Sequence, residues 1–580
     1  MPPNDPRSVI SERRWICAAV LACLSSCAFL RAEDASWIAA GSRGMVASDS
    51  ADASQAGLEI LKAGGNAMDA ATAVSFALGV TRPYSTGVGG GGFTIVRQAD
   101  GAVTVLDYRE AAPAAATRDM YVTPAASGKP RRNPSRNGHL AVAVPGLIAG
   151  RCEALKRFGT MPLARTLRPA IRLAREGFHV DDHYVANCRG TLAQYARDPS
   201  LRESCGYVYR VHLNDGRLRK VGERLKQPAL ARFLEALALQ GPDLFYKGEV
   251  AEASEREMVR HGGVLRADDL ENYRVVERTP ITGTYRGHTI ITMPPPSSGG
   301  ATLLQILNTL EPLDMTKLRR DDAPLAAHYM VEAMKHAFAD RARWFGDADF
   351  HPVPVAYLTS KQYGQQLSKQ IQSGRALDLQ GYGTSQLPED AGTSHFCVVD
   401  RWGNVVVSSE TINTSFGSLA AVAEWGIILN NEMDDFAAAP GKPNAYGLIQ
   451  SERNAIAPGK RPLSSMCPTI VLKDDKPYLL IGASGGPRII SSVLNVLMNV
   501  LDHGMTLEKA VRAPRLHHQW QPDAVFFDGP APEDLAAGLR GRGHRISDKP
   551  RGGVVQAIIR SSNGWIGASD PRKGGRPAGY

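Results

Sequence analysis

Thr393 to Ser418 reads TSHFCVVDRWGNVVVSSETINTSFGS, and this stretch decides the fold. The turn-forming run DRWGN at residues 400–404 lies between two apolar segments, which predicts a β-hairpin. A Thr opens the first strand, and the polar, Gly-containing run GYGTSQLPEDAG at 381–392 precedes it. The small Gly392 therefore offers an accessible carbonyl to the hydroxyl of Thr393, a geometry that suits self-cleavage.

The chemistry of such a cut follows from the two residues. Attack of the Thr393 hydroxyl on the Gly392 carbonyl gives an ester by an N-to-O acyl shift, and water then splits the chain. Thr393 becomes an N-terminus whose α-amino group, with an ordinary pKa of about 7.7–8.0, can take the proton from its own hydroxyl. The alternative is an ordinary edge hairpin that begins with a Thr.

Composition bounds the class of protein. The chain has 580 residues, of which 43% are hydrophobic and 22% charged, and its 57 Gly and 37 Pro are spread throughout, as in a globular enzyme with many turns. The net charge of +9 is not concentrated in basic runs, which indicates solvated surface and argues against nucleic-acid binding. After the first 32 residues no segment approaches 18 consecutive apolar residues, so no transmembrane segment is expected there.

Residues 1–32 have the pattern of an export signal. Arg13 and Arg14 precede an apolar run from Trp15 to Leu30, and small residues follow near Ala32. A lipidation box ending at Cys27 and a twin-arginine signal both remain open. The sequence thus predicts an exported protein, periplasmic or extracellular, with an anchor at a lipidated Cys27 as a variant.

The five cysteines after this leader show no metal-binding spacing; they are Cys152, Cys188, Cys205, Cys397 and Cys467. In an exported protein Cys188 and Cys205 are close enough in sequence to pair, and we predict a disulfide between them. Cys397 fits a small core residue. The histidines of the helix around 328–344 are interpreted as structural. No metal site and no cofactor are expected.

Hydrophobic periodicity divides the rest of the chain into alternating helices and strands. A helical region is expected to begin at Met45 and run to Leu61, and a second helix to begin after Asn66, with Asn66 as its cap and Asp69 in its first turn. Further helices are predicted at 147–158, 163–176, 228–239, 303–310 and 328–344, and strands at 93–96, 103–107, 275–293, 469–472 and 478–481.

Several polar stretches lie at the ends of these elements. Arg109 follows a predicted strand, where it either faces a pocket or lies on the surface. A dense polar patch covers 430–436, and a Pro/Gly-rich loop at 440–447 is of the kind that lies over a site. The glycines of 482–486 can present backbone N–H groups to an oxyanion.

Taken in order, these motifs resemble the gamma-glutamyltransferase (glutathione hydrolase) family over nearly the whole mature chain. The matching pieces are GGNAMDAATAV, GVGGGGF, LDYREAAP, PPPSSGG, GTSHFCVVD, LNNEMDDF, KRPLSSM, GASGGPRI, APRLHHQW and the terminal GASDPR…AGY. The resemblance implies an α/β (α+β) fold of the N-terminal-nucleophile type, a four-layer αββα sandwich. It also implies a precursor cut into a large subunit, 33–392, and a small subunit, 393–580, which form one heterodimeric catalytic unit.

The resemblance also assigns roles to residues of this chain. Thr393 would be the nucleophile of self-cleavage and catalysis, with Thr411 beside it. The substrate α-carboxylate would be held by Arg109, Ser464 and Ser465, and the α-ammonium by Asn413, Glu432 and Asp435. Gly485 and Gly486 would form the oxyanion hole, and Tyr446 would close over the pocket. The chain departs from many members at Ser394 and Cys397, which leaves the mechanism intact.

The expected activity is cleavage of γ-glutamyl amides, glutathione and its conjugates foremost, through a γ-glutamyl ester of Thr393. Water would complete hydrolysis, and an amino acid or short peptide would complete transfer. One rival is an acylase for other amides, such as the glutaryl side chains of β-lactams; it would leave Glu432 and Asp435 without an ammonium to face. Another is an uncut, inactive binding protein, which the retained Thr393 disfavours.

Overall fold

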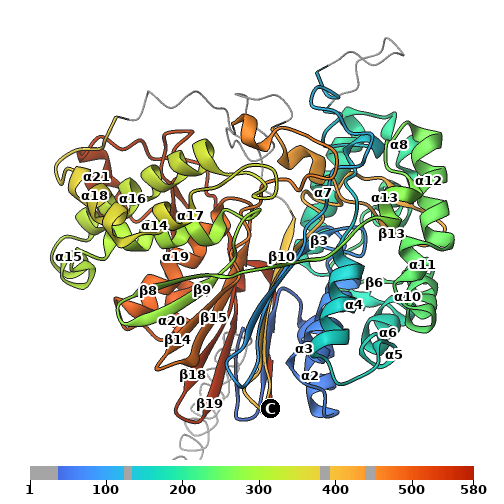
Figure 1. The fold of residues 1–580 in the computed structure, drawn as a ribbon, viewed down its shortest axis with the longest axis horizontal. Coiled ribbons are helices and arrows are strands. Elements are labelled where there is room, and N and C mark those ends of the chain that lie inside the picture. The colour runs from blue at the N-terminus through green and yellow to red at the C-terminus, as the bar shows by residue number, and fades with distance from the viewer. Residues whose placement is uncertain (1–36, 123–132, 379–391, 438–450) are drawn as a thin grey trace, which may run out of the picture.

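The computed structural model describes residues 37–122, 133–378, 392–437 and 451–580 (Figure 1). The predicted export signal, most of the run before Gly392 and the loop at 440–447 with Tyr446 lie outside these ranges. Within them, no helix is long and apolar enough to cross a membrane.

Two seven-stranded antiparallel sheets form the centre of the molecule. The first has the order β20 (Ala578–Gly579), β2 (Met45–Ser48), β10 (Thr393–Val399), β11 (Val405–Thr411), β3 (Gly91–Arg97), β4 (Val103–Tyr108) and β7 (Val276–Arg278). The second has the order β1 (Ile38–Gly41), β19 (Gly564–Ser569), β18 (Val554–Ser561), β15 (Lys476–Ser484), β14 (Thr469–Lys473), β9 (His288–Thr292) and β8 (Ile281–Tyr285).

Helices cover the outer face of each sheet (Figure 1). The first sheet is covered by α2 (Ala51–Lys62), α3 (Ala67–Thr81) and α4 (Leu147–Phe158), and the second by α14 (Gly299–Leu310), α16 (Ala323–Trp344) and α19 (Arg488–Leu501). The predicted four-layer αββα sandwich is confirmed.

Further helices and two-stranded pairs fill the two sides of the sandwich. Beside the first sheet are α5 (Leu163–Thr166), α6 (Arg168–Glu176), α7 (Asp182–Arg197), α8 (Leu201–Ser204), α9 (Gly206–Val211), α10 (Pro228–Gln240), α11 (Asp243–Tyr246), α12 (Glu249–His261) and α13 (Ala267–Glu271). Beside the second are α15 (Met315–Asp321), α17 (Val355–Leu358), α18 (Lys361–Gln370), α20 (Leu507–Arg512) and α21 (Glu533–Gly541). The two-stranded pairs are β5 (Phe178–His179) with β6 (Arg224–Leu225), β12 (Ala421–Val422) with β13 (Ile427–Ile428), and β16 (Leu516–His517) with β17 (Phe526–Phe527).

The predicted hairpin is confirmed as β10 and β11, which pair antiparallel with Thr393 opposite Thr411. Because successive side chains of a strand point to opposite faces, Phe396 and Val398 join the core under α2 and α3, whereas Cys397 and Val399 join the core between the sheets. Thr393 has the parity of Cys397, so its side chain points toward the seam between the two sheets.

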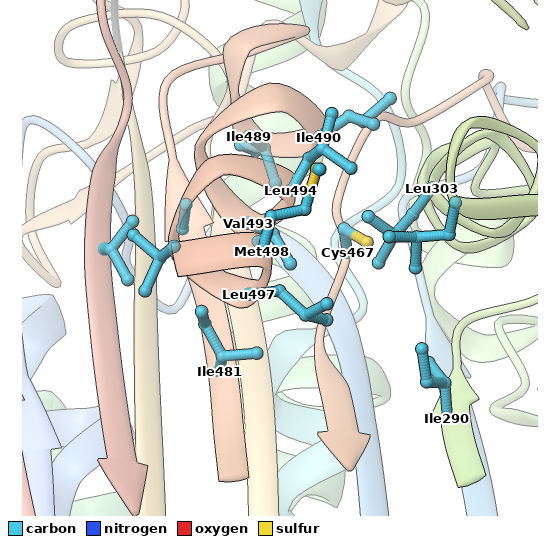
Figure 2. Packing of buried hydrophobic residues seen from close by; sticks show 14 of the residues in the cluster. Ile290, Leu303, Cys467, Ile481, Ile489, Ile490, Val493, Leu494, Leu497 and Met498 are labelled. Carbon is cyan, nitrogen blue, oxygen red and sulfur yellow. The ribbon is translucent and has the colours of Figure 1, made fainter. Parts of the chain in front are cut away.

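The helix α19 shows how the second sheet is closed on its outer side. Ile489, Ile490, Val493, Leu494 and Leu497 lie on the buried face of this helix and pack with Ile481 of β15 (Figure 2). This packing fixes the beginning of α19 directly after the end of β15, where the glycine turn of the predicted oxyanion hole lies.

Local predictions held where capping or periodicity was strong. The Asn66 side chain accepts hydrogen bonds from the Met68 and Asp69 amides, and Asp69 caps in return. The helical region predicted to begin at Met45 is wrong at its start, because Met45–Ser48 form strand β2 along β10. Small residues such as Ala47 suit a strand that is buried on both faces as well as they suit a helix.

The predicted disulfide between Cys188 and Cys205 is wrong, because both thiols are free. The Cys188 thiol donates to the His212 carbonyl at 3.6 Å, and the Ser204 hydroxyl donates to the Cys205 sulfur at 3.7 Å. The two sulfurs therefore have separate neighbours, although both belong to one hydrophobic cluster. Cys397 is a fully buried core residue, as expected.

Candidate active site

The strand ladder places two threonine side chains at one end of a buried pocket. Thr393 is 5% exposed and Thr411 2% exposed. The Thr411 hydroxyl donates to the Gly392 carbonyl at 2.5 Å and accepts from the Asn413 amide at 2.7 Å. This chain of hydrogen bonds polarises the carbonyl that precedes Thr393, because each donor strengthens the next.

Gly392 has a backbone that other residues rarely adopt. Its φ is +64°, and a Cβ added there would lie 2.5 Å from the Asn413 carbonyl oxygen. Only glycine fits this approach without strain, so the carbonyl can lie directly under the Thr411 hydroxyl.

A buried lysine fixes the other side of Thr393. Lys573 donates to the Thr393 carbonyl at 2.9 Å, to Asp49 at 2.7 Å and to the Ser484 hydroxyl at 3.3 Å. It thereby ties the first residue of β10 to the end of β15.

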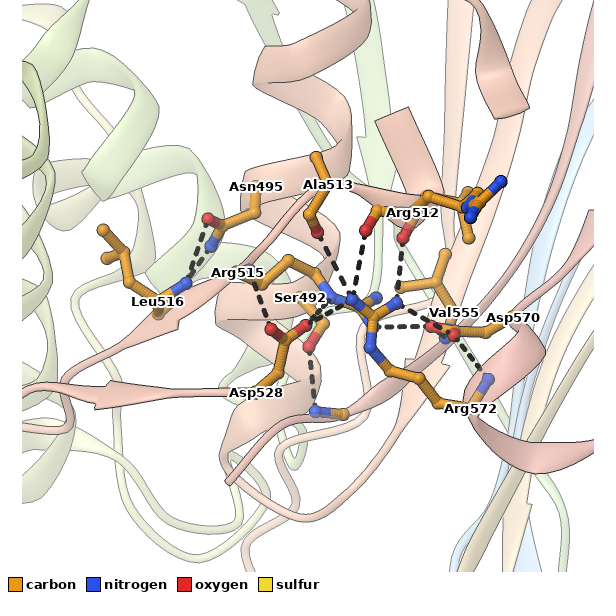
Figure 3. A network of polar contacts seen from close by, with 12 residues as sticks. Ser492, Asn495, Arg512, Ala513, Arg515, Leu516, Asp528, Val555, Asp570 and Arg572 are labelled. Atoms are coloured by element: carbon orange, nitrogen blue, oxygen red, sulfur yellow. Dashed lines mark hydrogen bonds and ion pairs between the residues drawn. The ribbon is translucent and has the colours of Figure 1, made fainter. Parts of the chain in front are cut away.

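The turn that carries Lys573 is itself held by a polar network (Figure 3). Arg515 donates to Asp528 at 2.8 Å and to Asp570 at 2.6 Å, and Arg572 donates to Asp570 at 3.1 Å. Burial alone would raise the pKa of Asp570. The guanidiniums of Arg515 and Arg572 outweigh this effect and hold the pKa below its usual value. The motif GASDPR near the C-terminus therefore contributes structure around the nucleophile.

At the other end of the pocket, Arg109 lies among three carboxylates. This fully buried side chain follows β4, as predicted, and is ion-paired with Glu432 and, at 2.5 Å, with Asp435. Glu110 lies 3.6 Å from it. The turn Glu432–Asp435, η4, belongs to the polar patch predicted at 430–436.

One guanidinium cannot offset the desolvation of three acids. Burial raises the pKa of Glu110 to about 8 and that of Asp435 to about 6, although Arg109 draws both down. Burial likewise raises the pKa of Glu432 well above its usual value. Arg341 also draws the pKa of Asp435 down, but less than Arg109 does. The cluster therefore presents three carboxyl groups to one directly paired guanidinium, which suits the addition of a further cation.

The two serines form the wall beside Arg109. The Ser464 amide donates to the Pro296 carbonyl at 3.0 Å and the Ser298 amide donates to the Ser464 carbonyl at 2.9 Å, which fixes this wall on the loop before α14. Arg341 of α16 donates to the Ser465 hydroxyl at 3.1 Å and to the Ser298 hydroxyl at 2.8 Å. Burial lowers the pKa of Arg341 to about 10, although the nearby Asp435 opposes this shift.

The glycine turn between β15 and α19 borders the same pocket. Gly485 has a φ of +127° and Gly486 a φ of +56°, conformations that favour glycine. Gly486 lines the pocket together with Thr393, whereas Gly485, which directly follows the last residue of β15, is not part of the lining.

Most of the predicted site residues thus meet in one cavity of about 20 Å³. Its lining includes Arg109, Thr393, Thr411, Asn413, Glu432, Asp435, Ser464, Ser465 and Gly486. Tyr446 lies outside the described residues. A larger cavity of about 890 Å³ lies around Cys152 and Tyr246 and shares no lining residue with the site.

Sequence reasoning missed Arg341 and Lys573. Arg341 lies on the helix around 328–344, of which only the histidines are interpreted, as structural groups, and its spacing gives no sign of a pocket. Lys573 directly follows the motif GASDPR, and this proximity is the sequence feature that could have identified it as a site residue. Leu463, Met466 and Ile489 complete the lining.

Comparison with known proteins agrees with this geometry. Residues 53–580 match the family model described as Gamma-glutamyltranspeptidase. The chain belongs to the gamma-glutamyltranspeptidase family. The glutathione hydrolase proenzyme of Escherichia coli (strain K12) is 44% identical over 535 residues, which cover 91% of this chain and 90% of that protein.

Acylases also occur among the relatives of this gamma-glutamyltranspeptidase family member. The Acylase ACY 1 proenzyme of Pseudomonas sp. (strain SE83) is 41% identical, covering 93% of this chain and 94% of that protein. The crystal structure of cephalosporin acylase from Bacillus halodurans superposes with a TM-score of 0.82 at 30% identity, covering 94% of this chain and 97% of that one. The fold is therefore that of the N-terminal-nucleophile hydrolases.

Proposed function

We propose that this protein cuts its own chain between Gly392 and Thr393 and then cleaves γ-glutamyl amides, glutathione and its conjugates foremost. The observation that carries the proposal is the pairing of Arg109 with Glu432 and Asp435 in the pocket that holds Thr393. A free amino-acid head group presents one carboxylate and one ammonium, which is the complement of this pair.

Binding would exchange one set of ion pairs for another. In the substrate-free pocket Arg109 is paired with Glu432 and Asp435. When a zwitterionic head group inserts between them, its α-carboxylate meets Arg109 and the Ser464 and Ser465 hydroxyls, and its α-ammonium meets Glu432, Asp435 and Asn413. Each charge of the head group would then face an opposite charge, which offsets part of its desolvation cost.

Self-cleavage would use the polarised carbonyl of Gly392. The Thr393 oxygen attacks this carbon, and the hydrogen bond from Thr411 stabilises the developing oxyanion. The hydroxyl proton passes to the amide nitrogen, the C–N bond breaks, and an ester to Thr393 remains. Water hydrolyses this ester to a carboxyl group on Gly392 and the free hydroxyl of Thr393. The products are a large subunit ending at Gly392 and a small subunit beginning at Thr393, which remain together as a heterodimer.

Catalysis would then use the new N-terminus. The Thr393 α-amine accepts the hydroxyl proton, the oxygen attacks the γ-carbonyl, and the amides of Gly485 and Gly486 stabilise the oxyanion. The leaving amine departs with a proton, and water or the amino group of an acceptor resolves the γ-glutamyl ester. The export pattern of residues 1–32 would place this reaction outside the cytoplasm.

An acylase is the second candidate, since relatives with that name match nearly the full length. A glutaryl amide has the α-carboxylate position but no ammonium, so binding it would leave Asp435 and Glu432 without a cation from the substrate. The buried carboxylates therefore favour the γ-glutamyl reading.

The test uses purified protein and two chromogenic anilides of the same chain length, γ-glutamyl and glutaryl. We expect rapid release of the anilide from the γ-glutamyl compound, faster release when a dipeptide acceptor is added, and little from the glutaryl compound. If the protein preferred the glutaryl compound, it would be an acylase. If the cut protein released the anilide from neither compound, both proposed activities would be wrong.

A further inference from the structure

A cluster of two imidazoles and a carboxylate lies away from the catalytic pocket, where helix α12 meets the turn η1 (His139–Ala141). We propose that His139, Glu257 and His261 bind a divalent transition-metal ion of the zinc class. Each residue offers one donor atom, and the three atoms lie within 4.8 Å of one another.

The geometry of the cluster is close to that of a metal site. Glu257 and His261 lie four residues apart and therefore on one face of α12. The Glu257 oxygen is 4.0 Å from Nε2 of His139 and 3.6 Å from Nε2 of His261. Donors about 2.0–2.2 Å from a tetrahedral zinc ion are about 3.3–3.6 Å apart. The Glu257–His261 pair already has this separation, and the Glu257–His139 pair lies outside it by about half an ångström.

The donor set selects the class of ion. Imidazole suits zinc, copper, cobalt and nickel, whereas calcium and magnesium prefer sites built from oxygen alone. The two imidazole rings are stacked, with centroids 4.6 Å apart and planes 25° from parallel, and both direct Nε2 to the same carboxylate. His139 is buried, and His261 and Glu257 are half-buried, so an ion can enter from the side of α12 while water completes its coordination.

A second cluster, His328, Glu332 and His544, has the same residue types and provides a contrast. There Lys335 donates to Glu332 at 3.1 Å, so an ammonium already neutralises the carboxylate. Both ring nitrogens of His328 are in hydrogen bonds, to His544 at 2.7 Å and to the Gln372 carbonyl at 2.8 Å. In that cluster a lysine already supplies the counter-charge of the carboxylate, whereas the carboxylate of the α12 cluster lies beside two imidazole nitrogens.

The α12 cluster is connected to the head-group end of the active site. His139 begins η1, and two residues after this turn the Ala143 amide donates to the Asn430 side chain at 3.0 Å. The same Asn430 oxygen accepts from the Glu432 amide at 3.0 Å, and the Asn430 amide group donates to the Ala143 carbonyl at 2.9 Å. A bound ion would therefore fix η1 on α12 and stabilise the segment that carries Glu432.

The test is equilibrium dialysis of the full-length, self-cleaved protein against Zn²⁺, with the metal content measured after removal of excess ion. Glu257→Gln and His261→Gln change half-buried side chains outside the catalytic pocket, and a cooperative unfolding transition shows that each variant is folded. His179→Gln, at an exposed histidine, is the matched control. Thermal unfolding with and without Zn²⁺ provides a second readout, because an ion that binds only the folded state raises the midpoint.

We expect one zinc ion per wild-type and His179→Gln protein, loss of that ion in Glu257→Gln and His261→Gln, and a rise in the unfolding midpoint only where zinc is retained. Cobalt substitution should give the visible bands of a low-symmetry site with nitrogen ligands. Equal zinc content in wild type and both cluster variants, or no zinc in wild type, would overturn the proposal.

Discussion

At one end of the pocket Thr393 and Thr411 lie among hydroxyl groups and backbone carbonyls, whereas at the other end Arg109 lies among Glu110, Glu432 and Asp435. At the threonine end, one hairpin and its strand register place Thr393 opposite Thr411, although Lys573 and Gly486 come from other segments. The charged end joins segments more than 300 residues apart in the sequence. Bond making would thus rely on local backbone geometry, and head-group recognition on long-range charge pairing.

The two buried arginines of the pocket show what the charged end depends on. Burial opposes the charge of both, but the carboxylates around Arg109 more than compensate and raise its pKa. Arg341 has hydroxyl partners, and burial lowers its pKa to about 10. A substrate carboxylate that binds between the two arginines would meet Arg109, which already has carboxylate partners. It would also meet Arg341, which would add an anion to its hydroxyl partners.

The largest effect is expected at the threonine end. Thr393→Ala should leave a single uncut chain, because no hydroxyl remains to begin the acyl shift. Denaturing electrophoresis and intact mass measure this directly. Thr393→Ser is the matched control and should still be cut at Gly392. Efficient cutting of Thr393→Ala without added protease would show that this end does not work as described.

At the charged end, Asp435→Asn keeps the shape of the pocket and removes a charge that faces the substrate ammonium. We expect kcat/KM for a γ-glutamyl anilide to fall by about 30- to 1000-fold, equivalent to roughly 2–4 kcal/mol for a desolvated pair. Glutaryl anilide serves as the control, since it lacks the ammonium and should be little affected. An unchanged ratio of γ-glutamyl to glutaryl cleavage would mean that the head-group assignment is wrong.

Thr411→Val tests whether the two ends of the pocket act independently. It removes the hydrogen-bond donor to the Gly392 carbonyl and leaves the charged end intact. Loss of one oxyanion donor costs on the order of 100-fold in rate, so we expect slow self-cleavage. The time course of fragment appearance after translation measures it. Once cut, the variant should retain its preference for γ-glutamyl over glutaryl substrates; loss of that preference would show that the ends are not separable.

Arg341→Met should have a smaller effect, on the order of tenfold in KM for γ-glutamyl anilide, because the hydrogen bond that positions the Ser465 hydroxyl is lost. Arg341→Lys should recover part of it. A 4-aminobutyryl anilide has the ammonium but no α-carboxylate, so its cleavage, however slow, should be insensitive to Arg341. Equal losses on both substrates would indicate that Arg341 only supports the fold.

The smallest effect is a pH dependence of the charged end. Burial raises the pKa of Asp435 to about 6, and only the ionised form attracts the substrate ammonium. The value of kcat/KM should therefore fall as the pH drops through about 6, since this parameter reports groups of the free enzyme. The Asp435→Asn profile should lack this limb, and an identical acid limb in both proteins would assign it to another group.

The same contrast explains how much of the molecule could be predicted. The hairpin, the Asn66 cap and the helix from Leu147 to Phe158 follow from local periodicity and capping, and the structure has them. The segment of strand β2 was predicted to be helical, because its small buried residues fit the period of a helix as well as that of a strand. Its pairing with β10 makes it a strand, but β10 lies about 350 residues away in the sequence.

The parts of the site that are formed by neighbouring residues could be predicted from the sequence more readily than those formed by distant residues. Thr393 and Gly392 suggested their chemistry from adjacency alone, whereas grouping Arg109 with Glu432 and Asp435 required the family resemblance. Arg341 gave no signal, and Lys573 gave only its position after the motif GASDPR, because the roles of both arise from the residues that tertiary packing brings beside them. For the same reason sequence distance misled for Cys188 and Cys205, which are near in the chain but have different neighbours.

The central claim is that Thr393 carries the γ-glutamyl group, and trapping that ester tests it most directly. Self-cleaved protein would be mixed with a γ-glutamyl anilide without acceptor, quenched in acid and digested, and the peptides analysed by mass spectrometry. The account predicts the mass of one γ-glutamyl group on the peptide that begins at Thr393, and its disappearance when a dipeptide acceptor is added before quenching. A γ-glutamyl group on any other residue, or cleavage with no adduct on Thr393 under rapid quenching, would contradict it.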